Sequence, residues 1–104
     1  MFVIQWSLDI VFGKQKDALE IIKKWGAEKF RSSNFKKSRD SRVMTGFIGE
    51  SGAHIVDEYV FDNLDDFEKA LADMGQPQFQ EFSKAIAPFI VPGTQKWTVY
   101  KIVS

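Results

Sequence analysis

Residues 2–12, FVIQWSLDIVF, alternate between two kinds of side chain. One set is wholly apolar and consists of Phe2, Ile4, Trp6, Leu8, Ile10 and Phe12. The other set is mixed and consists of Val3, Gln5, Ser7, Asp9 and Val11. A period of two over this length predicts a β-strand, and we expect its apolar face to meet the core.

Outward from this strand, Gly13 breaks the alternation and a helical pattern follows. Ala18, Ile21, Ile22 and Trp25 have the spacing of a helix that buries one side, and we expect this helix to end near Phe30. Two further strands are predicted at residues 42–50 and 53–61, because the sequence GESGA between them supplies the glycines of a hairpin turn.

The second half of the chain has clear helix signals. Asp62 or Asn63 is placed to cap a helix that runs to Gly75, and Pro77 suits the first turn of another. Pro88 should end or kink that helix, and a last strand is predicted at residues 94–103.

The elements therefore follow the order β-α-β-β-α-β, with the second helical region divided in two. This order predicts an α+β protein with a ferredoxin-like fold, in which one antiparallel sheet carries helices on one face. No linker or second domain is visible, so we expect residues 1–104 to form a single domain.

The order and size resemble the dimeric α+β barrel superfamily. The resemblance is carried by Trp6 in the first strand, NLDDFEKAL at residues 63–71 and KWTVYKIV at residues 96–103. It implies a homodimer formed through the sheet face, and a pocket between the helices and the sheet. Members include cofactor-independent antibiotic-biosynthesis monooxygenases, haem-degrading monooxygenases, isomerases and proteins without an assigned activity.

Composition narrows the classes of partner. Lys plus Arg and Asp plus Glu are 14 each, so no basic excess favours nucleic acid. No apolar run is long enough to cross a bilayer, and the amino-terminal residues have the pattern of a strand rather than a signal peptide. The chain has no cysteine, which fits a cytoplasmic location.

Two side chains are candidates for proton transfer. His54 is the only histidine, and histidine is a natural base near neutral pH. The alternative is that His54 is a structural residue at the sheet edge or dimer face. Asp57 shares a strand face with Ile55, Tyr59 and Phe61. If that face meets the helices, Asp57 points toward them; the alternative is that the two faces of this strand are reversed. A carboxylate there is either a catalytic acid or base at a cavity, or is paired with a lysine or an amide.

No metal site and no cofactor are predicted. His54 and Glu58 are too far apart along a strand to share a metal, and no second His or Cys can complete a site. Haem-degrading members of the superfamily use a helical histidine, and none of the predicted helices contains one.

A ligand pocket could be lined by five aromatic residues: Trp6, Trp25, Tyr59, Trp97 and Tyr100. Relatives in the superfamily bind flat aromatic substrates in such pockets. The alternative is that these rings are ordinary core residues.

The segment RSSNFKKSRDSR, residues 31–42, holds five cations and one anion. We expect a loop, which is either a solvated connection or a site where Arg39 and Arg42 clamp a small anion. The sequence thus leaves two functions open. One is a homodimeric small-molecule-binding protein, which would act as a cofactor-independent enzyme of the monooxygenase or isomerase kind. The other is a non-catalytic accessory or anion-binding module.

Overall fold

The computed structural model describes all 104 residues of the chain. The strands are β1 (Phe2–Asp9), β2 (Asp40–Thr45), β3 (His54–Phe61) and β4 (Lys96–Lys101). The α-helices are α1 (Gln15–Ser32), α2 (Leu64–Asp73) and α3 (Pro77–Ile86). Two short 3₁₀ helices, η1 (Asn34–Lys37) and η2 (Ala87–Phe89), follow α1 and α3.

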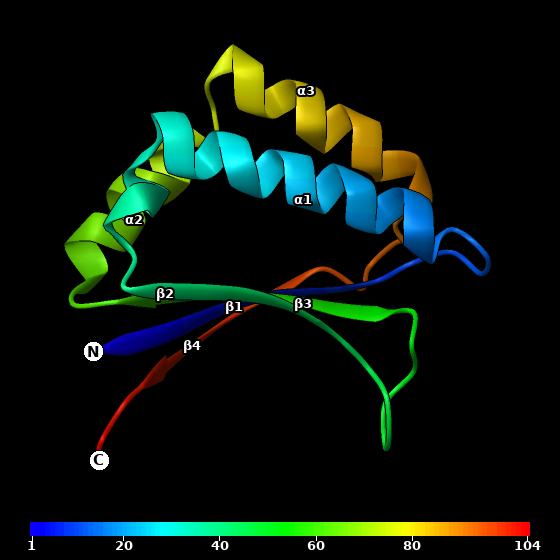
Figure 1. The fold of residues 1–104 in the computed structure, drawn as a ribbon, viewed down its shortest axis with the longest axis horizontal. Helices are drawn as coiled ribbons and strands as arrows, with labels where there is room; N and C mark the ends of the chain where they lie inside the picture. Colours follow the sequence, from blue (N-terminus) through cyan, green and yellow to red (C-terminus); the bar gives the residue numbers. More distant parts are fainter.

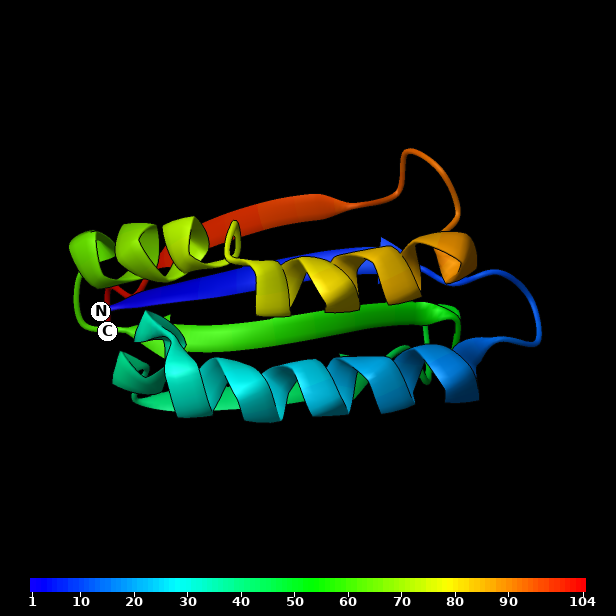
Figure 2. The same ribbon diagram turned by 90° about the horizontal axis from the view of Figure 1, so that it is seen from above.

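The strands form one antiparallel sheet in the order β2-β3-β1-β4. All three α-helices lie on one face of this sheet, and the opposite face carries no helix (Figure 1). Seen from above, α1 runs along the side of β2 and β3, whereas α2 and α3 cover the side of β1 and β4 (Figure 2). The predicted ferredoxin-like α+β fold is therefore confirmed.

The core lies between the sheet and the helices, as the alternation in β1 predicted. Ile4, Trp6 and Leu8 are buried there, and the register sets Trp6 between Asp57 of β3 and Trp97 of β4. Asp57 therefore faces the helices, which decides between the two orientations that the sequence left open.

Several predicted boundaries were wrong by a few residues. Regular pairing of β1 stops at Asp9, and Phe12, expected in the core, is exposed in the turn that Gly13 closes with a φ of 80°. β2 ends at Thr45, not near residue 50, so residues 46–53 form a longer connection than the predicted hairpin turn.

The basic segment 31–42 is not the long loop that was predicted. α1 continues to Ser32, η1 follows, and β2 begins at Asp40. The reason is Phe35, which is fully buried with its ring 4.5 Å from that of Tyr59 and so draws the segment onto the core.

No helix in the structure combines the length and the apolar character required to cross a membrane.

Candidate functional site

The structure has one cleft, with a volume of about 260 Å³, between α1 and the β2–β3 side of the sheet. Helix α1 contributes Ile22, Lys23, Gly26, Ala27 and Phe30 to its lining. The sheet contributes Ser41, Arg42, Val43, Asp57 and Tyr59. The walls are largely apolar, and Asp57 is the one carboxylate among them.

Asp57 belongs to a buried cluster of three polar side chains. Its Oδ2 atom lies 3.3 Å from Nζ of Lys29 and accepts a hydrogen bond of 2.9 Å from the hydroxyl of Tyr59. Nζ of Lys29 also donates to the Tyr59 hydroxyl at 3.1 Å, which closes the triangle. Lys29 is only 3% exposed and Asp57 only 4%, so each charge depends on the other for compensation.

The second carboxylate oxygen of Asp57 is free. Both contacts use Oδ2, and Oδ1 accepts no hydrogen bond from the chain. Oδ1 is not fully buried, since the fully buried side-chain atoms without a hydrogen-bond partner are Nε1 of Trp25 and Oγ of Ser38. Asp57 lines the cleft, and its Oδ1 atom is a hydrogen-bond acceptor without a partner in the chain.

Aromatic rings surround the lysine ammonium group. Nζ of Lys29 lies 4.6 Å from the ring centre of Trp25, 4.9 Å from that of Phe35 and 5.9 Å from that of Trp6. The ring faces attract the cation and hold it in a fixed place beside Asp57. Burial lowers the pKa of Lys29, and the nearby charge of Asp57 opposes that shift.

The same environment keeps Tyr59 in its neutral form. Burial, and then the charge of Asp57, raises the pKa of the Tyr59 hydroxyl far above its usual range. Tyr59 therefore acts as a hydrogen-bond donor to Asp57 rather than as a base.

This shift predicts a pH dependence of stability. Above about pH 10 the unfolded chain loses the Tyr59 proton while the native protein keeps it, so the unfolded state binds fewer protons and stability falls as pH rises. We expect the free energy of unfolding to fall with pH more steeply in the wild type than in Tyr59→Phe. The difference between the two slopes should be about 1.4 kcal/mol per pH unit. Urea denaturation between pH 9 and about pH 11.5 measures both slopes, and equal slopes would contradict the prediction.

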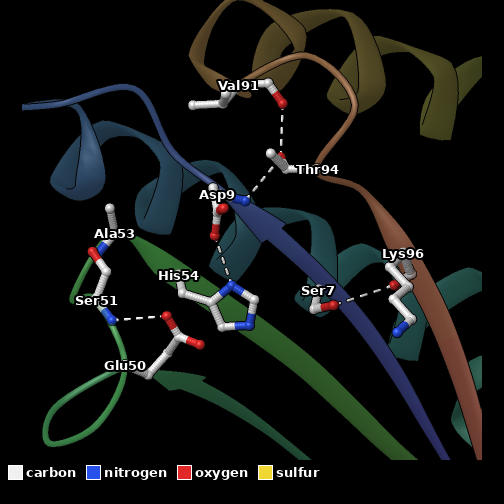
Figure 3. A network of polar contacts seen from close by, with 9 residues as sticks. All are labelled: Ser7, Asp9, Glu50, Ser51, Ala53, His54, Val91, Thr94 and Lys96. Carbon is white, nitrogen blue, oxygen red and sulfur yellow. Dashed lines mark hydrogen bonds and ion pairs between the residues drawn. The ribbon is translucent and has the colours of Figure 1, made fainter.

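His54 lies outside the cleft. Its Nδ1 atom is 2.7 Å from Oδ1 of Asp9, across the β1–β3 pair, on the sheet face that carries no helix. The backbone amide of Asp9 in turn donates to Thr94, whose hydroxyl donates to the Val91 carbonyl (Figure 3). The network ties three chain segments together at the end of the sheet.

The structure brings together only part of the predicted aromatic pocket. Tyr59 lines the cleft, whereas Trp6 and Trp25 do not, and the ring centres of these two tryptophans lie 5.5 Å apart. Trp97 stacks on Trp6 from the β4 side, 6.2 Å away. Tyr100 pairs with Val3 and so lies on the opposite face of the sheet, away from the other four rings.

The two candidate anion-binding arginines already have partners. Nε of Arg39 lies 2.5 Å from Asp62, and Nε of Arg42 lies 2.5 Å from Glu58. Arg42 contacts Glu58 on the helix-free face of the sheet, since these two residues are register partners next to Asp57 and Val43. No group of three His, Asp or Glu side chains is arranged to hold a metal ion.

Two residues of the site were missed in the sequence. Lys29 follows Ala18, Ile22 and Trp25 at spacings of four, three and four, so it lies on the buried stripe of α1. This spacing was the signal that could have identified it. Gly26 lines the cleft in the middle of α1, where a glycine costs helix stability.

Solved structures share this fold over nearly their whole length. An uncharacterized NIPSNAP domain protein from Burkholderia xenovorans superimposes with a TM-score of 0.78 at 20% identity, over 100% of this chain and 96% of that chain. A NIPSNAP family protein of unknown function from Agrobacterium tumefaciens gives a TM-score of 0.77 at 20% identity, over 98% and 87% of the two chains. A proposed antibiotic biosynthesis monooxygenase from Nitrosomonas europaea gives 0.75 at 12% identity, over 100% of each.

No family model matches the sequence, and no curated protein matches it either. The structural neighbours share the ferredoxin-like α+β fold that the sequence predicted for this chain. Likeness at this level of identity concerns the fold, so function has to be argued from the site.

Proposed function

We propose that the protein binds a small, largely apolar molecule in the cleft, with a hydrogen-bond donor of that molecule on Oδ1 of Asp57. The observation that supports this most strongly is a buried carboxylate that lines the cleft, with one oxygen anchored by Lys29 and Tyr59 and the other without a partner in the chain. A ligand O–H or N–H group would satisfy that oxygen, and Ile22, Phe30 and Val43 would contact the apolar body.

We further propose that the bound molecule undergoes proton transfer to Asp57. Asp57 would take a proton from an O–H or an acidic C–H of the ligand, in a reaction of the isomerase or cofactor-independent monooxygenase kind. Lys29 and Tyr59 would act as positioning residues, because they hold the carboxylate in one orientation. The neighbour from Nitrosomonas europaea, a proposed antibiotic biosynthesis monooxygenase, has the same fold, which agrees with this proposal.

The proposed assembly is a homodimer through the helix-free face of the sheet. Apolar side chains on that face include Val3, Met44, Val56 and Val60, all only partly exposed in the single chain. Several of its charges are paired within the chain, since Glu58 accepts from both Gln5 and Arg42 and Asp9 contacts His54. Two copies of such a face can meet without net repulsion.

An anion-binding module is less well supported. The charges of Arg39 and Arg42 are offset by carboxylates of the same chain, so the segment offers an anion little unpaired positive charge.

Thermal unfolding with a panel of compounds tests the proposed function. The panel contains phenols, aromatic carboxylic acids, flavin, haem and inorganic phosphate. We expect phenols and similar hydroxylated rings to raise the melting temperature, since a ligand at a hundred times its dissociation constant adds about 2.7 kcal/mol of stability.

The matched variant is Asp57→Asn, which keeps the shape of the side chain and removes its charge. We expect it to weaken binding and to abolish turnover of any substrate that is found. Stabilisation by phosphate alone, or equal binding by wild type and Asp57→Asn, would contradict the proposal.

A further inference from the structure

Strand β2 is at the edge of the sheet, and its outer side has no neighbouring strand. In an antiparallel pair, every second residue exchanges both of its backbone hydrogen bonds with the residue opposite. The amide of Gly46 donates to the carbonyl of His54, and these two residues continue the register of β2 and β3. The residues of β2 whose backbone groups bond to β3 are therefore Met44, Arg42 and Asp40.

The alternate residues of β2, which are Ser41, Val43 and Thr45, direct their backbone groups away from the sheet. The other side of β3 agrees with this assignment. There the amide of Ile10 donates to the carbonyl of Ala53, so the odd-numbered residues of β3 bond to β1 and the even-numbered ones to β2. The Ser41 amide donates to the side chain of Asp40 instead. The amides and carbonyls of Val43 and Thr45 are left without a partner.

This unpaired edge borders the cleft. Ser41 and Val43 line the cleft from β2, and α1 runs along the same side of the sheet as the opposite wall (Figure 2). The middle of that wall is formed by Gly26 and Ala27, and a glycine lets another backbone approach closely. A groove between a helix and an unpaired strand edge has the geometry that accepts an extended peptide as an additional strand.

We propose that the molecule bound in the cleft is a short extended peptide that adds to β2 as an antiparallel strand, with a tyrosine opposite Val43. This inference rests on the proposed function, because Asp57 remains the residue that anchors the ligand. The tyrosine would exchange both backbone hydrogen bonds with Val43. Its side chain would lie on the helix side of the sheet, as that of Val43 does, and would enter the cleft.

The walls of the cleft favour tyrosine at this position. An added strand lies about 4.8 Å beyond β2 and so about 10 Å from β3, which bears Asp57, and only a long side chain covers that separation. The phenol hydroxyl supplies the donor for Oδ1 of Asp57, and Ile22 and Phe30 supply apolar contacts for the ring. A lysine or arginine would instead bring a second cation to a carboxylate whose charge Lys29 already compensates.

The test uses three blocked peptides, each titrated into the ¹⁵N-labelled protein. The first is acetyl-Val-Tyr-Val-amide. The second carries a methyl group on the tyrosine nitrogen, which removes the N–H that would donate to the carbonyl of Val43. The third carries the methyl group on the nitrogen of the last valine, whose N–H would point away from β2. We expect the first and third peptides to bind alike, and the second to bind roughly tenfold or more weakly.

Hydrogen exchange gives a second measurement, with a control residue in the same strand. In the free protein the Val43 amide should exchange quickly, and the Met44 amide, which is bonded to β3, should exchange slowly. Saturation with the first peptide should slow exchange at Val43 by roughly tenfold or more and should leave Met44 unchanged.

The outcomes separate this inference from the proposed function. Equal affinity of the first two peptides, or unchanged exchange at Val43, would overturn the inference. Binding of phenol without binding of any peptide would also overturn it, and would leave the proposed function standing. Slow exchange at Val43 in the free protein would mean that the edge is already covered, by a second copy if dilution restores fast exchange, and would again overturn the inference. Binding of neither phenol nor peptide would overturn the proposed function itself.

Discussion

Lys29→Met is expected to lower the free energy of unfolding by about 3–5 kcal/mol, because it leaves the carboxylate of Asp57 buried without its cation. That amount is a large part of the total stability of a domain of this size, about 5–15 kcal/mol. The variant should therefore unfold at a much lower urea concentration than the wild type. Methionine matches the length of the lysine stem, so the effect reports on the charge rather than on a cavity.

Two control variants separate the charge effect from other causes. Lys24→Met makes the same change at an exposed position of α1 and should alter stability little. The double variant Lys29→Met/Asp57→Leu removes both charges and should recover most of the loss, since a buried ion pair can often be replaced by apolar residues. If Lys29→Met unfolds at the same urea concentration as Lys24→Met, the ion pair does not stabilise the protein in the way described.

Gly26→Leu is expected to eliminate ligand binding in the cleft, and the fold should persist. Gly26 lines the cleft, and apart from the adjoining residues and backbone of its own helix no atom lies within 4 Å of the position that a Cβ atom would take. A leucine side chain can therefore occupy the cleft without displacing its walls. Gly26→Ala should stabilise α1 by about 1 kcal/mol, because alanine replaces glycine in a helix interior.

The comparison is with Glu20→Leu, which places a leucine on an exposed position of the same helix. Affinities of all three variants for a ligand found in the compound panel are measured by titration calorimetry. We expect Glu20→Leu to bind like the wild type and Gly26→Leu to show no binding. Wild-type affinity in a folded Gly26→Leu protein would mean that the ligand binds elsewhere.

Much of the fold could be predicted because two simple periods describe most of the chain. The alternation at residues 2–12 identifies β1 and its buried face, and the same logic places Asp57 and Tyr59 on the inner face of β3. It also separates Tyr100 from Trp97, since residues three apart on a strand point to opposite faces.

The basic segment was mispredicted because its composition is that of a loop, whereas its single aromatic residue decides its path. Burial of Phe35 against Tyr59 is a tertiary contact, and the charges around it conceal that contact in the sequence.

The candidate site was only half visible in the sequence. Asp57 was recognised because a carboxylate is conspicuous on an apolar strand face. Its partner Lys29 was not recognised, because a lysine on a helix is normally exposed. Lys29 lies on the buried side of α1 because it follows Trp25 by four residues. Which oxygen of Asp57 has no partner depends on interatomic distances, and these cannot be predicted from the periodicity of the sequence.

The most direct test of the central claim, that the cleft between α1 and the β2–β3 edge binds a small molecule through Asp57, is an NMR titration. The ¹⁵N-labelled protein is titrated with the compound that gives the largest thermal stabilisation, and the amide shifts are followed residue by residue. We predict that the largest changes occur at Gly26, Ala27, Phe30, Ser41 and Val43, which line the cleft, and that they vanish in Gly26→Leu. Changes confined to residues 46–53, which connect β2 to β3, or to the helix-free face of the sheet would contradict the account.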